Sequence, residues 1–300
     1  MNTNGTQFRL ETGLNADHFT EVSFTAYEDI TFTGANNDQV HAWFHRPQGY
    51  SSTSSSVSRA EEKKKCPLLL FIHGGPQGAW NNQWHSRWNL QVFANQGYAV
   101  LAINIHGSTG YGQPFCDSIN NDWGGKPFTD LMLGVDHVLQ KYEWLDEKRM
   151  AALGGSYGGY MVNWINGHTD RFKALVCHAG IFNLTSLYYA TEELFFPEWE
   201  FNGPAYDQEE AYEKWSPHKY VKNWKTPTLV IQGGKDYRVV ETEALSTFTA
   251  LQRRGIISEL LHFPEENHFV TNPNNSLAWH SHIFNWLAHF LNEDTTQDKE

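Results

Sequence analysis

Short, unbroken apolar runs alternate with helical stretches along most of this 300-residue chain. Runs that are apolar throughout are typical of parallel strands buried on both faces of a sheet. The alternation therefore predicts an α/β fold, with a mainly parallel twisted sheet and helices on both faces. The runs cover residues 68–72, 98–103, 150–153, 174–177, 228–231 and 260–263, and the helical stretches cover residues 130–142, 157–167, 241–254 and 276–291.

The segments outside this alternation differ in character. A stretch rich in Ser and charge predicts a flexible surface loop, because it has little apolar surface to bury. An aromatic and acidic stretch interrupts the alternation of strands and helices and is expected to lie over one end of the sheet. We expect one domain over residues 21–292, polar tails at 1–20 and 293–300, antiparallel strands at 22–32 and 40–44, the loop at 49–65 and the insertion at 182–224.

Charge and composition narrow the range of partners. The formal net charge of −12 repels nucleic-acid phosphates and anionic membrane surfaces, so we expect neither as a partner. The chain has no apolar run as long as a bilayer crossing, and its start lacks the basic and apolar regions of a signal peptide. The compartment stays open: cytoplasmic if the chain is complete, secreted or periplasmic if it is a processed piece of a longer precursor.

Cysteine usage and motifs give no sign of a cofactor. Three cysteines are too few for a disulfide scaffold in a chain of this length. A Cys66–Cys116 bridge stays open, whereas Cys177 lies in an apolar run typical of a buried thiol. The sequence contains neither a Cys-x-x-Cys pair nor a Gly-rich loop followed by Lys and Ser or Thr. We therefore expect no metal and no cofactor.

A Gly-rich stretch, GGSYG at residues 154–158, lies between a predicted strand and a predicted helix. This G-x-S-x-G pattern is typical of a tight turn that exposes a serine hydroxyl above the sheet. Gly154 and Gly158 let neighbouring backbone approach where a Cβ would clash. The positive end of the helix favours negative charge that develops at Ser156. We predict that Ser156 is a nucleophile; an incidental serine in a Gly-rich turn is the alternative.

A serine hydroxyl needs a base, and the base needs an acid to orient it. In the hydrolase arrangement the three residues follow the chain order serine, acid, histidine. Asp236 lies just past the run at 228–231, and His268 lies just past the run at 260–263. Both therefore follow strand ends that we expect to meet near Ser156. His178 ends its own strand but precedes Asp236, so we assign it to packing or to support of the site.

Backbone N–H groups are the expected donors to the oxyanion of the reaction. One donor should be Tyr157, the residue after the nucleophile. The other should come from the His73-Gly74-Gly75 sequence after the first central strand, and we choose Gly75 because glycine leaves its N–H unshielded. An ordinary strand-ending turn is the alternative.

Several stretches of the chain resemble the catalytic domain of the prolyl oligopeptidase family of serine peptidases. The resemblance covers residues 31–291 and is strongest to the branch of dipeptidyl-peptidase V and acylaminoacyl peptidases. It implies an α/β-hydrolase fold, a Ser156–Asp236–His268 triad, and Gly75 and Tyr157 as oxyanion donors. The matching stretches are "HGGPQGAW", "GSTGYGQPF", "DWGGKPFTDLMLGVD", "GGSYGGYMVNWINGHTDRFKALVCHAG", "TEELFFPEWEFNGP", "WSPHKYVKNWKTPTLVIQGGKDYRV" and "FPEENHFV".

The chain departs from the family in two places. His106 stands where the family's R-G-S-T-G-Y-G stretch has arginine, which affects a charge contact that supports this loop. Family members also typically carry a β-propeller before this domain, and we expect none within this chain. The propeller normally restricts substrates to small peptides, and acidic groups outside the hydrolase core commonly hold the substrate amine in the dipeptidyl peptidases. The sequence therefore leaves open whether this chain cleaves substrates after the second residue from the N-terminus.

The insertion supplies candidates for a substrate pocket. Glu193, with Glu192 beside it, is a candidate for holding a substrate amine; a solvated helix start is the favoured alternative. Aromatic side chains could line an apolar pocket before the scissile bond or pack the insertion on the sheet. The aromatic candidates are Phe182, Tyr188, Phe195, Phe196 and Trp199.

The leading hypothesis is a serine peptidase that cleaves short peptides or acyl-peptides, as a dipeptidyl-peptidase or acylaminoacyl-peptidase type of exopeptidase, through an acyl-enzyme on Ser156. One alternative keeps the chemistry but makes the chain a carboxylesterase with an open site. Another makes it an inactive fragment that serves as a binding module. The expected partner is a small peptide or acyl-peptide substrate, and a homo-oligomer stays open.

Overall fold

The computed structural model describes residues 12–20, 23–50 and 65–292, so the predicted tails and the loop predicted at 49–65 lie largely outside the described residues. Within them, eight strands form one sheet in the order β1-β2-β4-β3-β5-β6-β7-β8. β2 pairs antiparallel with β1 and β4, and all other neighbours pair parallel, as predicted. The strands are β1 (Tyr27–Thr33), β2 (Gln39–His45), β3 (Cys66–Ile72), β4 (Ala99–Asn104), β5 (Leu145–Gly155), β6 (Ala174–His178), β7 (Thr228–Gly233) and β8 (Ser258–Phe263).

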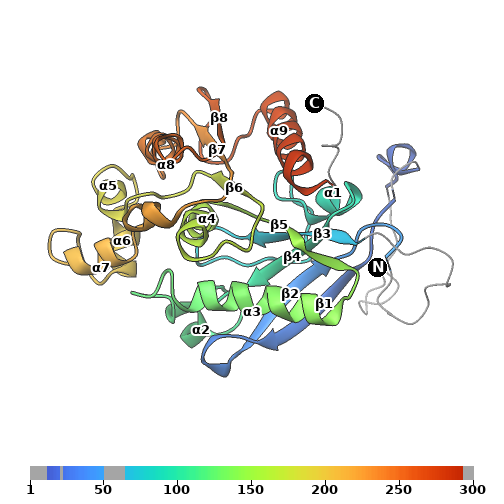
Figure 1. Cartoon of the computed structure of the whole chain (residues 1–300), viewed down its shortest axis with the longest axis horizontal. Coiled ribbons are helices and arrows are strands. Elements are labelled where there is room, and N and C mark those ends of the chain that lie inside the picture. Colours follow the sequence, from blue (N-terminus) through green and yellow to red (C-terminus); the bar gives the residue numbers. More distant parts are fainter. Residues whose placement is uncertain (1–11, 21–22, 51–64, 293–300) are drawn as a thin grey trace.

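Helices cover both faces of the sheet because its central strands are apolar on both sides (Figure 1). Leu69 and Phe71 of β3 pack in the core under α1 and α9, whereas Leu68 and Leu70 pack under α3 and α4. The helix α8 covers Val230 of β7. These helices are α1 (Leu90–Asn95), α3 (Lys126–Lys141), α4 (Tyr157–His168), α8 (Glu241–Arg253) and α9 (Pro273–Leu291); the short α2 (Gln113–Asp117) and 3-10 turns at Asp17–Phe19 and Ala35–Asn37 complete this set.

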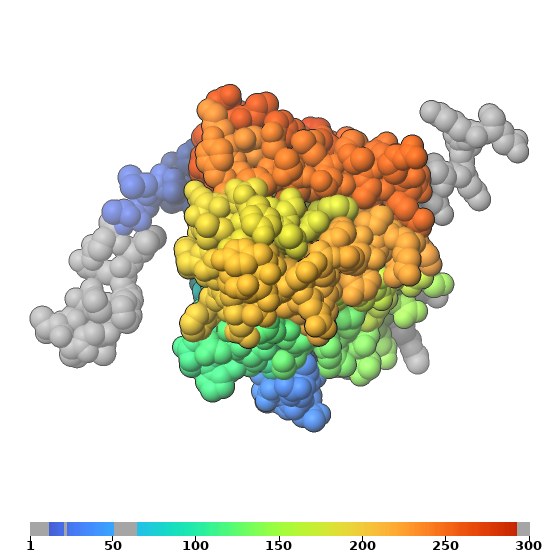
Figure 2. Space-filling view, turned by 90° about the vertical axis from the view of Figure 1, so that its left-hand side faces the viewer, coloured from blue at the N-terminus to red at the C-terminus, as the bar shows by residue number. Residues whose placement is uncertain are grey.

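The insertion predicted at 182–224 forms a layer of short helices at one end of the molecule. Figure 2 shows it in yellow and light orange across the middle of that end. It contains α5 (Leu184–Tyr188), α6 (Phe195–Glu200), α7 (Glu209–Lys214) and a 3-10 segment at Pro217–Asn223. Buried aromatic residues such as Phe201 and Tyr212 join it to the core below α4. The insertion is therefore part of the packed domain and contributes surface near the strand ends.

The predicted strands and the four predicted helices are confirmed, with shifted ends. The helix α3 begins earlier than predicted, at Lys126, because Pro127 fits a first turn whose N–H groups have no helical partner. β5 begins earlier than predicted, at the buried Leu145, because the residues at 146–149 that follow it are charged and interrupt the apolar run. The helix α1 was not predicted, because six residues are too few to show a helical period.

The described residues settle the cysteine pairing that the sequence left open. The structure has Cys66, Cys116 and Cys177 as free thiols, so the open Cys66–Cys116 alternative is not realised. Within the described ranges, every helix is either too short or too polar to cross a bilayer.

Candidate active site

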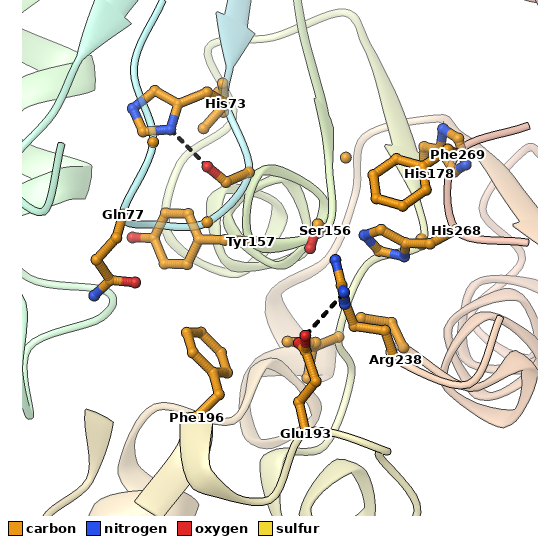
Figure 3. Close-up of a pocket in the computed structure, with 18 of the residues that line it drawn as sticks. His73, Gln77, Ser156, Tyr157, His178, Glu193, Phe196, Arg238, His268 and Phe269 are labelled. Carbon is orange, nitrogen blue, oxygen red and sulfur yellow. Dashed lines mark hydrogen bonds and ion pairs between the residues drawn. The ribbon is translucent and has the colours of Figure 1, made fainter. Parts of the chain in front are cut away.

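The carboxyl ends of the parallel strands meet at one edge of the sheet. His73, Ser156, His178 and His268 follow or end four of these strands, and all four side chains line one cavity. Figure 3 shows the hydroxyl of Ser156 and the ring of His268 facing the same space. Ligands of open α/β sheets bind at this edge, so the cavity is the candidate active site.

Ser156 occupies a strained turn between β5 and α4. Its φ of 60° and ψ of −122° lie outside the regions that side-chain-bearing residues favour. The N–H of Ser156 donates to the carbonyl of His178 at 2.9 Å, which anchors the turn to β6. A Cβ on Gly158 would lie 2.2 Å from the carbonyl oxygen of Ile72, and one on Gly154 would lie 2.4 Å from that of Gly158. Only glycine at both positions allows this turn.

Asp236 and His268 form a buried, hydrogen-bonded pair. Nδ1 of His268 donates to Oδ2 of Asp236 at 2.6 Å. The other carboxylate oxygen accepts from the backbone N–H groups of Arg238 at 3.0 Å and Val239 at 2.9 Å. Because these contacts fix the carboxylate and occupy Nδ1, the ring is oriented and Nε2 is the nitrogen left for a reacting group.

The serine lies beside this pair without being bonded to it. Among the described residues, no hydrogen bond joins Oγ of Ser156 to Nε2 of His268. Contacts of this kind are often long in a free enzyme and tighten when substrate binds. The structure therefore brings the three predicted residues to the same strand-end site. The hydrogen bond between Oγ of Ser156 and Nε2 of His268 is the one contact of a triad that is not formed.

The loop after β3 passes directly beside the nucleophile. A Cβ built on Gly74 would lie 3.1 Å from Cβ of Ser156 and 3.8 Å from its Oγ. Gly75 and Tyr157 both line the cavity. The N–H of Tyr157 is the first of α4 and has no acceptor within the helix. The two residues predicted as oxyanion donors thus flank Ser156.

His73 ties the loop after β3 to the loop after β4. Its Nδ1 donates to the carbonyl of Gly74 at 2.8 Å, and its Nε2 accepts from the hydroxyl of Ser108 at 2.8 Å. Burial lowers the pKa of His73 to about 4, so the ring is neutral at neutral pH. The N–H of Thr109 also donates to the carbonyl of Gly78 at 2.9 Å. These contacts fix the backbone next to Ser156.

His106, at the position where the resemblance predicts arginine, is buried between two carboxylates. Its Nδ1 lies 2.6 Å from Oδ2 of Asp130, and its Nε2 lies 3.1 Å from Oδ2 of Asp38. Burial alone lowers the pKa of His106, but the hydrogen bonds and charges of Asp130 and Asp38 outweigh it and raise the pKa. Contacts to carboxylates under this loop are therefore made by histidine at the position where the resemblance implies arginine.

The cavity has a volume of about 480 Å³ and an aromatic wall built partly by the insertion. Of the residues predicted for a substrate pocket, Glu193, Phe195 and Phe196 line this cavity. The ring of Phe196 packs against Trp123 with 5.8 Å between ring centroids, whereas Phe195 is mostly exposed. One face of the cavity can thus receive an apolar side chain.

The structure does not bring the other three predicted pocket residues to this cavity. Phe182 packs against Trp224, with 5.9 Å between ring centroids. Tyr188 is buried, and its hydroxyl donates to Glu198 at 2.9 Å. Trp199 is exposed on α6. The physical reason is that the insertion packs on the rest of the domain: Tyr188 belongs to the core shared with α3 and α4, and Phe182 packs in the cluster under α8.

Glu193 shares the cavity with an arginine. Its Oε1 lies 2.8 Å from Nη2 of Arg238, and both side chains are only partly exposed. In Figure 3 the guanidinium of Arg238 points between the carboxylate of Glu193 and the ring of His268. A charged substrate group at this place would meet a carboxylate and a guanidinium together.

Sequence reasoning missed several residues that shape the cavity. Arg238 could have been found, because it lies two residues after Asp236 at the same strand end. Glu200 gave no signal within its helix, yet its buried carboxylate accepts from Nε1 of Trp123 at 2.5 Å and from Nε2 of Gln77 at 2.6 Å. Burial raises the pKa of Glu200, although both hydrogen bonds lower it. Glu200 thereby joins the insertion to the loop after β3.

Comparison with known families and proteins identifies relatives of this chain. Residues 84–294 match the family described as the prolyl oligopeptidase family. Dipeptidyl-peptidase 5 of Schizosaccharomyces pombe is 45% identical over 281 residues, which cover 93% of this chain and 40% of that protein. The probable dipeptidyl-peptidase 5 of Emericella nidulans is 46% identical over 263 residues, which cover 86% of this chain and 35% of that protein.

Solved structures give the same fold. An acylaminoacyl peptidase of Pyrococcus horikoshii superposes with a TM-score of 0.84 and 25% identity over 96% of this chain and 45% of that chain. A puromycin-hydrolyzing peptidase of Mycobacterium tuberculosis gives a TM-score of 0.78 and 26% identity over 90% of this chain and 40% of that chain. The predicted α/β-hydrolase fold is confirmed, and this chain spans less than half the length of these relatives.

Proposed function

This chain belongs to the prolyl oligopeptidase family, and we propose that it is a serine peptidase that cleaves short peptides through an acyl-enzyme on Ser156. One observation carries the proposal. The 2.6 Å hydrogen bond between Asp236 and His268 orients a base in the cavity where the strained turn exposes Ser156. A nucleophile, a base and an orienting carboxylate are the parts that acyl transfer needs.

In the proposed reaction, Oγ of Ser156 attacks the substrate carbonyl while Nε2 of His268 takes its proton. Asp236 holds the ring through Nδ1 and stabilises the imidazolium that forms. The N–H groups of Gly75 and Tyr157 donate to the oxyanion of the tetrahedral intermediate. His268 then protonates the leaving amine, and the C–N bond breaks to give the acyl-enzyme.

Water completes the cycle by the same route. His268 takes a proton from water, the hydroxide attacks the acyl carbon, and Ser156 leaves with the proton returned by His268. Turnover requires a neutral imidazole at the start.

For the substrate, we propose a short peptide whose apolar side chain before the scissile bond packs on Phe195 and Phe196. Glu193 faces the same cavity and is proposed to hold a free substrate amine, with Arg238 beside it. The S. pombe and E. nidulans relatives are named dipeptidyl-peptidases, whereas the P. horikoshii neighbour is named an acylaminoacyl peptidase. The two names differ in whether the substrate carries a free amine, so Glu193 is the residue on which the choice depends.

The proposal is tested with an active-site-directed fluorophosphonate and two amide substrates, a dipeptidyl amide and an acyl-amino-acid amide. We expect wild-type protein to be labelled on Ser156 and to hydrolyse at least one amide. Ser156→Ala should abolish labelling and hydrolysis while thermal unfolding stays similar. Labelling that persists in Ser156→Ala would place the nucleophile elsewhere. Hydrolysis of nitrophenyl esters without either amide would favour a carboxylesterase instead.

A further inference from the structure

Arg87 lies in the loop between β3 and α1 and lines the cavity of Ser156 and His268. Its Nη1 donates to the backbone carbonyl of His268 at 3.0 Å. The same nitrogen lies 3.4 Å from Nδ1 of His178. Arg87 thus contacts the segment that carries the proposed base and the strand end next to the proposed nucleophile.

His178 connects this arginine to the serine turn. Its carbonyl accepts the N–H of Ser156 at 2.9 Å, and its Nδ1 accepts from Nε1 of Trp279 at 3.2 Å. Burial, followed by the nearby charges of Arg87 and His268, lowers the pKa of His178 well below its ordinary value. His178 is therefore a neutral acceptor toward Arg87. A continuous path of contacts runs from the turn at Ser156 through His178 and Arg87 to the backbone of His268.

The guanidinium of Arg87 stays charged in this position. Burial lowers the pKa of Arg87 to about 10, against the opposing effect of Asp236, so the group remains a cation at neutral pH. Its centre lies 5.8 Å from the ring centroid of Trp88 and 6.0 Å from that of Phe269. Among the described residues, no carboxylate forms an ion pair with it. The cation therefore contacts two aromatic rings and the carbonyl oxygen of His268, next to the Asp236–His268 pair.

We propose that Arg87 is a positioning residue that holds the His268 segment against the Ser156 turn, so that Nε2 can close on Oγ. The inference rests on the proposed serine-peptidase function. The contact between Ser156 and His268 is the one that remains open, and Arg87 is bonded to the backbone of one partner and linked through His178 to the backbone of the other. A shift of about 1 Å in such a contact can lower a rate by about 100-fold.

The test compares Arg87→Met, Arg87→Lys and wild type, with Arg171→Met as matched control. Arg171 pairs with Asp136 on the surface near the start of β6, at the opposite edge of the sheet. We would measure kcat, KM and the rate of fluorophosphonate labelling, each per folded molecule as judged by circular dichroism and thermal unfolding. Arg87→Met should lose about 10- to 100-fold in kcat and in labelling rate with KM changed little. Arg87→Lys, which keeps a cationic donor, should recover part of that loss, and Arg171→Met should match wild type.

Each outcome supports or overturns the positioning role of Arg87. Equal labelling rates and kcat in Arg87→Met and wild type would overturn the inference. A loss that appears in KM alone, or that vanishes when rates are expressed per folded molecule, would also overturn it. If Arg87→Met does not fold, Arg87→Lys decides by the same split between kcat and KM. Failure of wild-type protein to be labelled on Ser156 would instead overturn the proposed function, so the two failures are distinguishable.

Discussion

The strand-end edge (Ser156, Asp236 and His268) and the insertion wall (Glu193, Phe195 and Phe196) face the same cavity but are built differently. Backbone contacts hold the edge: two N–H groups donate to Asp236, and the carbonyl of His178 anchors Ser156. The wall consists of an exposed aromatic ring, a half-buried one and a partly exposed ion pair. A rigid edge suits chemistry common to all substrates, whereas an adaptable wall suits the distinction between them.

If the strand-end edge performs chemistry common to all substrates, a change there should affect all substrates equally. In Asp236→Asn the amide would favour the wrong ring tautomer of His268, so kcat should fall about 10,000-fold. We expect the same factor with free-amine, acylated and ester substrates, measured by steady-state kinetics. A loss confined to one substrate class would show that Asp236 acts in recognition rather than in orienting His268.

A change at the insertion wall should instead affect some substrates more than others. Glu193→Gln removes the carboxylate proposed to bind a substrate amine, and hydrogen bonds to charged groups contribute about 1.5–3 kcal/mol. The value of kcat/KM for a dipeptidyl amide should therefore fall roughly 10- to 100-fold, whereas that for its N-acetylated analogue should change little. Equal losses for both substrates would indicate that Glu193 serves to hold Arg238 in place.

A smaller effect is expected from the apolar part of the wall. Phe196→Ala removes the ring that packs on Trp123, so a bulky apolar side chain of the substrate loses one of its contacts. The value of kcat/KM should fall about 10-fold for substrates with Phe or Leu before the scissile bond and less for those with Ala. A uniform decrease across this series would place Phe196 in support of the edge.

The smallest expected effect is on the pH dependence of stability, through the buried His106 below the active-site loops. The pKa of His106 is raised above its ordinary value of 6.5 in the folded chain. Its contribution to stability is therefore full below pH 6.5 and is lost as pH rises through the folded-state pKa. Unfolding measured from pH 5 to pH 9 should show this decline in wild type and a flatter profile in His106→Gln. The same decline in both proteins would assign it to other groups.

The sequence predicted the edge far better than the wall, and the reason is physical. A run that is apolar throughout specifies a strand, and a parallel sheet fixes where each run ends. Asp236 and His268 could therefore be placed with no knowledge of the loops that hold them. Phe182 and Phe196 look alike in sequence, yet one packs against Trp224 and the other lines the cavity. Short helices in the insertion decide that difference through contacts that carry no periodic signal.

Residues that act through contacts between distant parts of the chain could not be predicted from the sequence either. Arg87 contacts the backbone of His268, which lies 181 positions away along the chain. Glu200 joins Trp123 and Gln77 from different loops. No local pattern marks such residues, because their partners are set only when the sheet and the insertion have packed. By contrast, the GGSYG turn could be predicted because its constraints lie within a few residues.

We propose that turnover passes through an ester on Ser156 formed with help from the Asp236–His268 pair. The most direct measurement is acid quench of wild-type protein during turnover of a nitrophenyl ester, followed by intact-mass analysis and peptide mapping. We predict an added acyl mass on the peptide that contains Ser156, at close to one group per molecule when deacylation is slow. Turnover with no acyl mass under these conditions, or an acyl group on any other residue, would contradict an acyl-enzyme on Ser156.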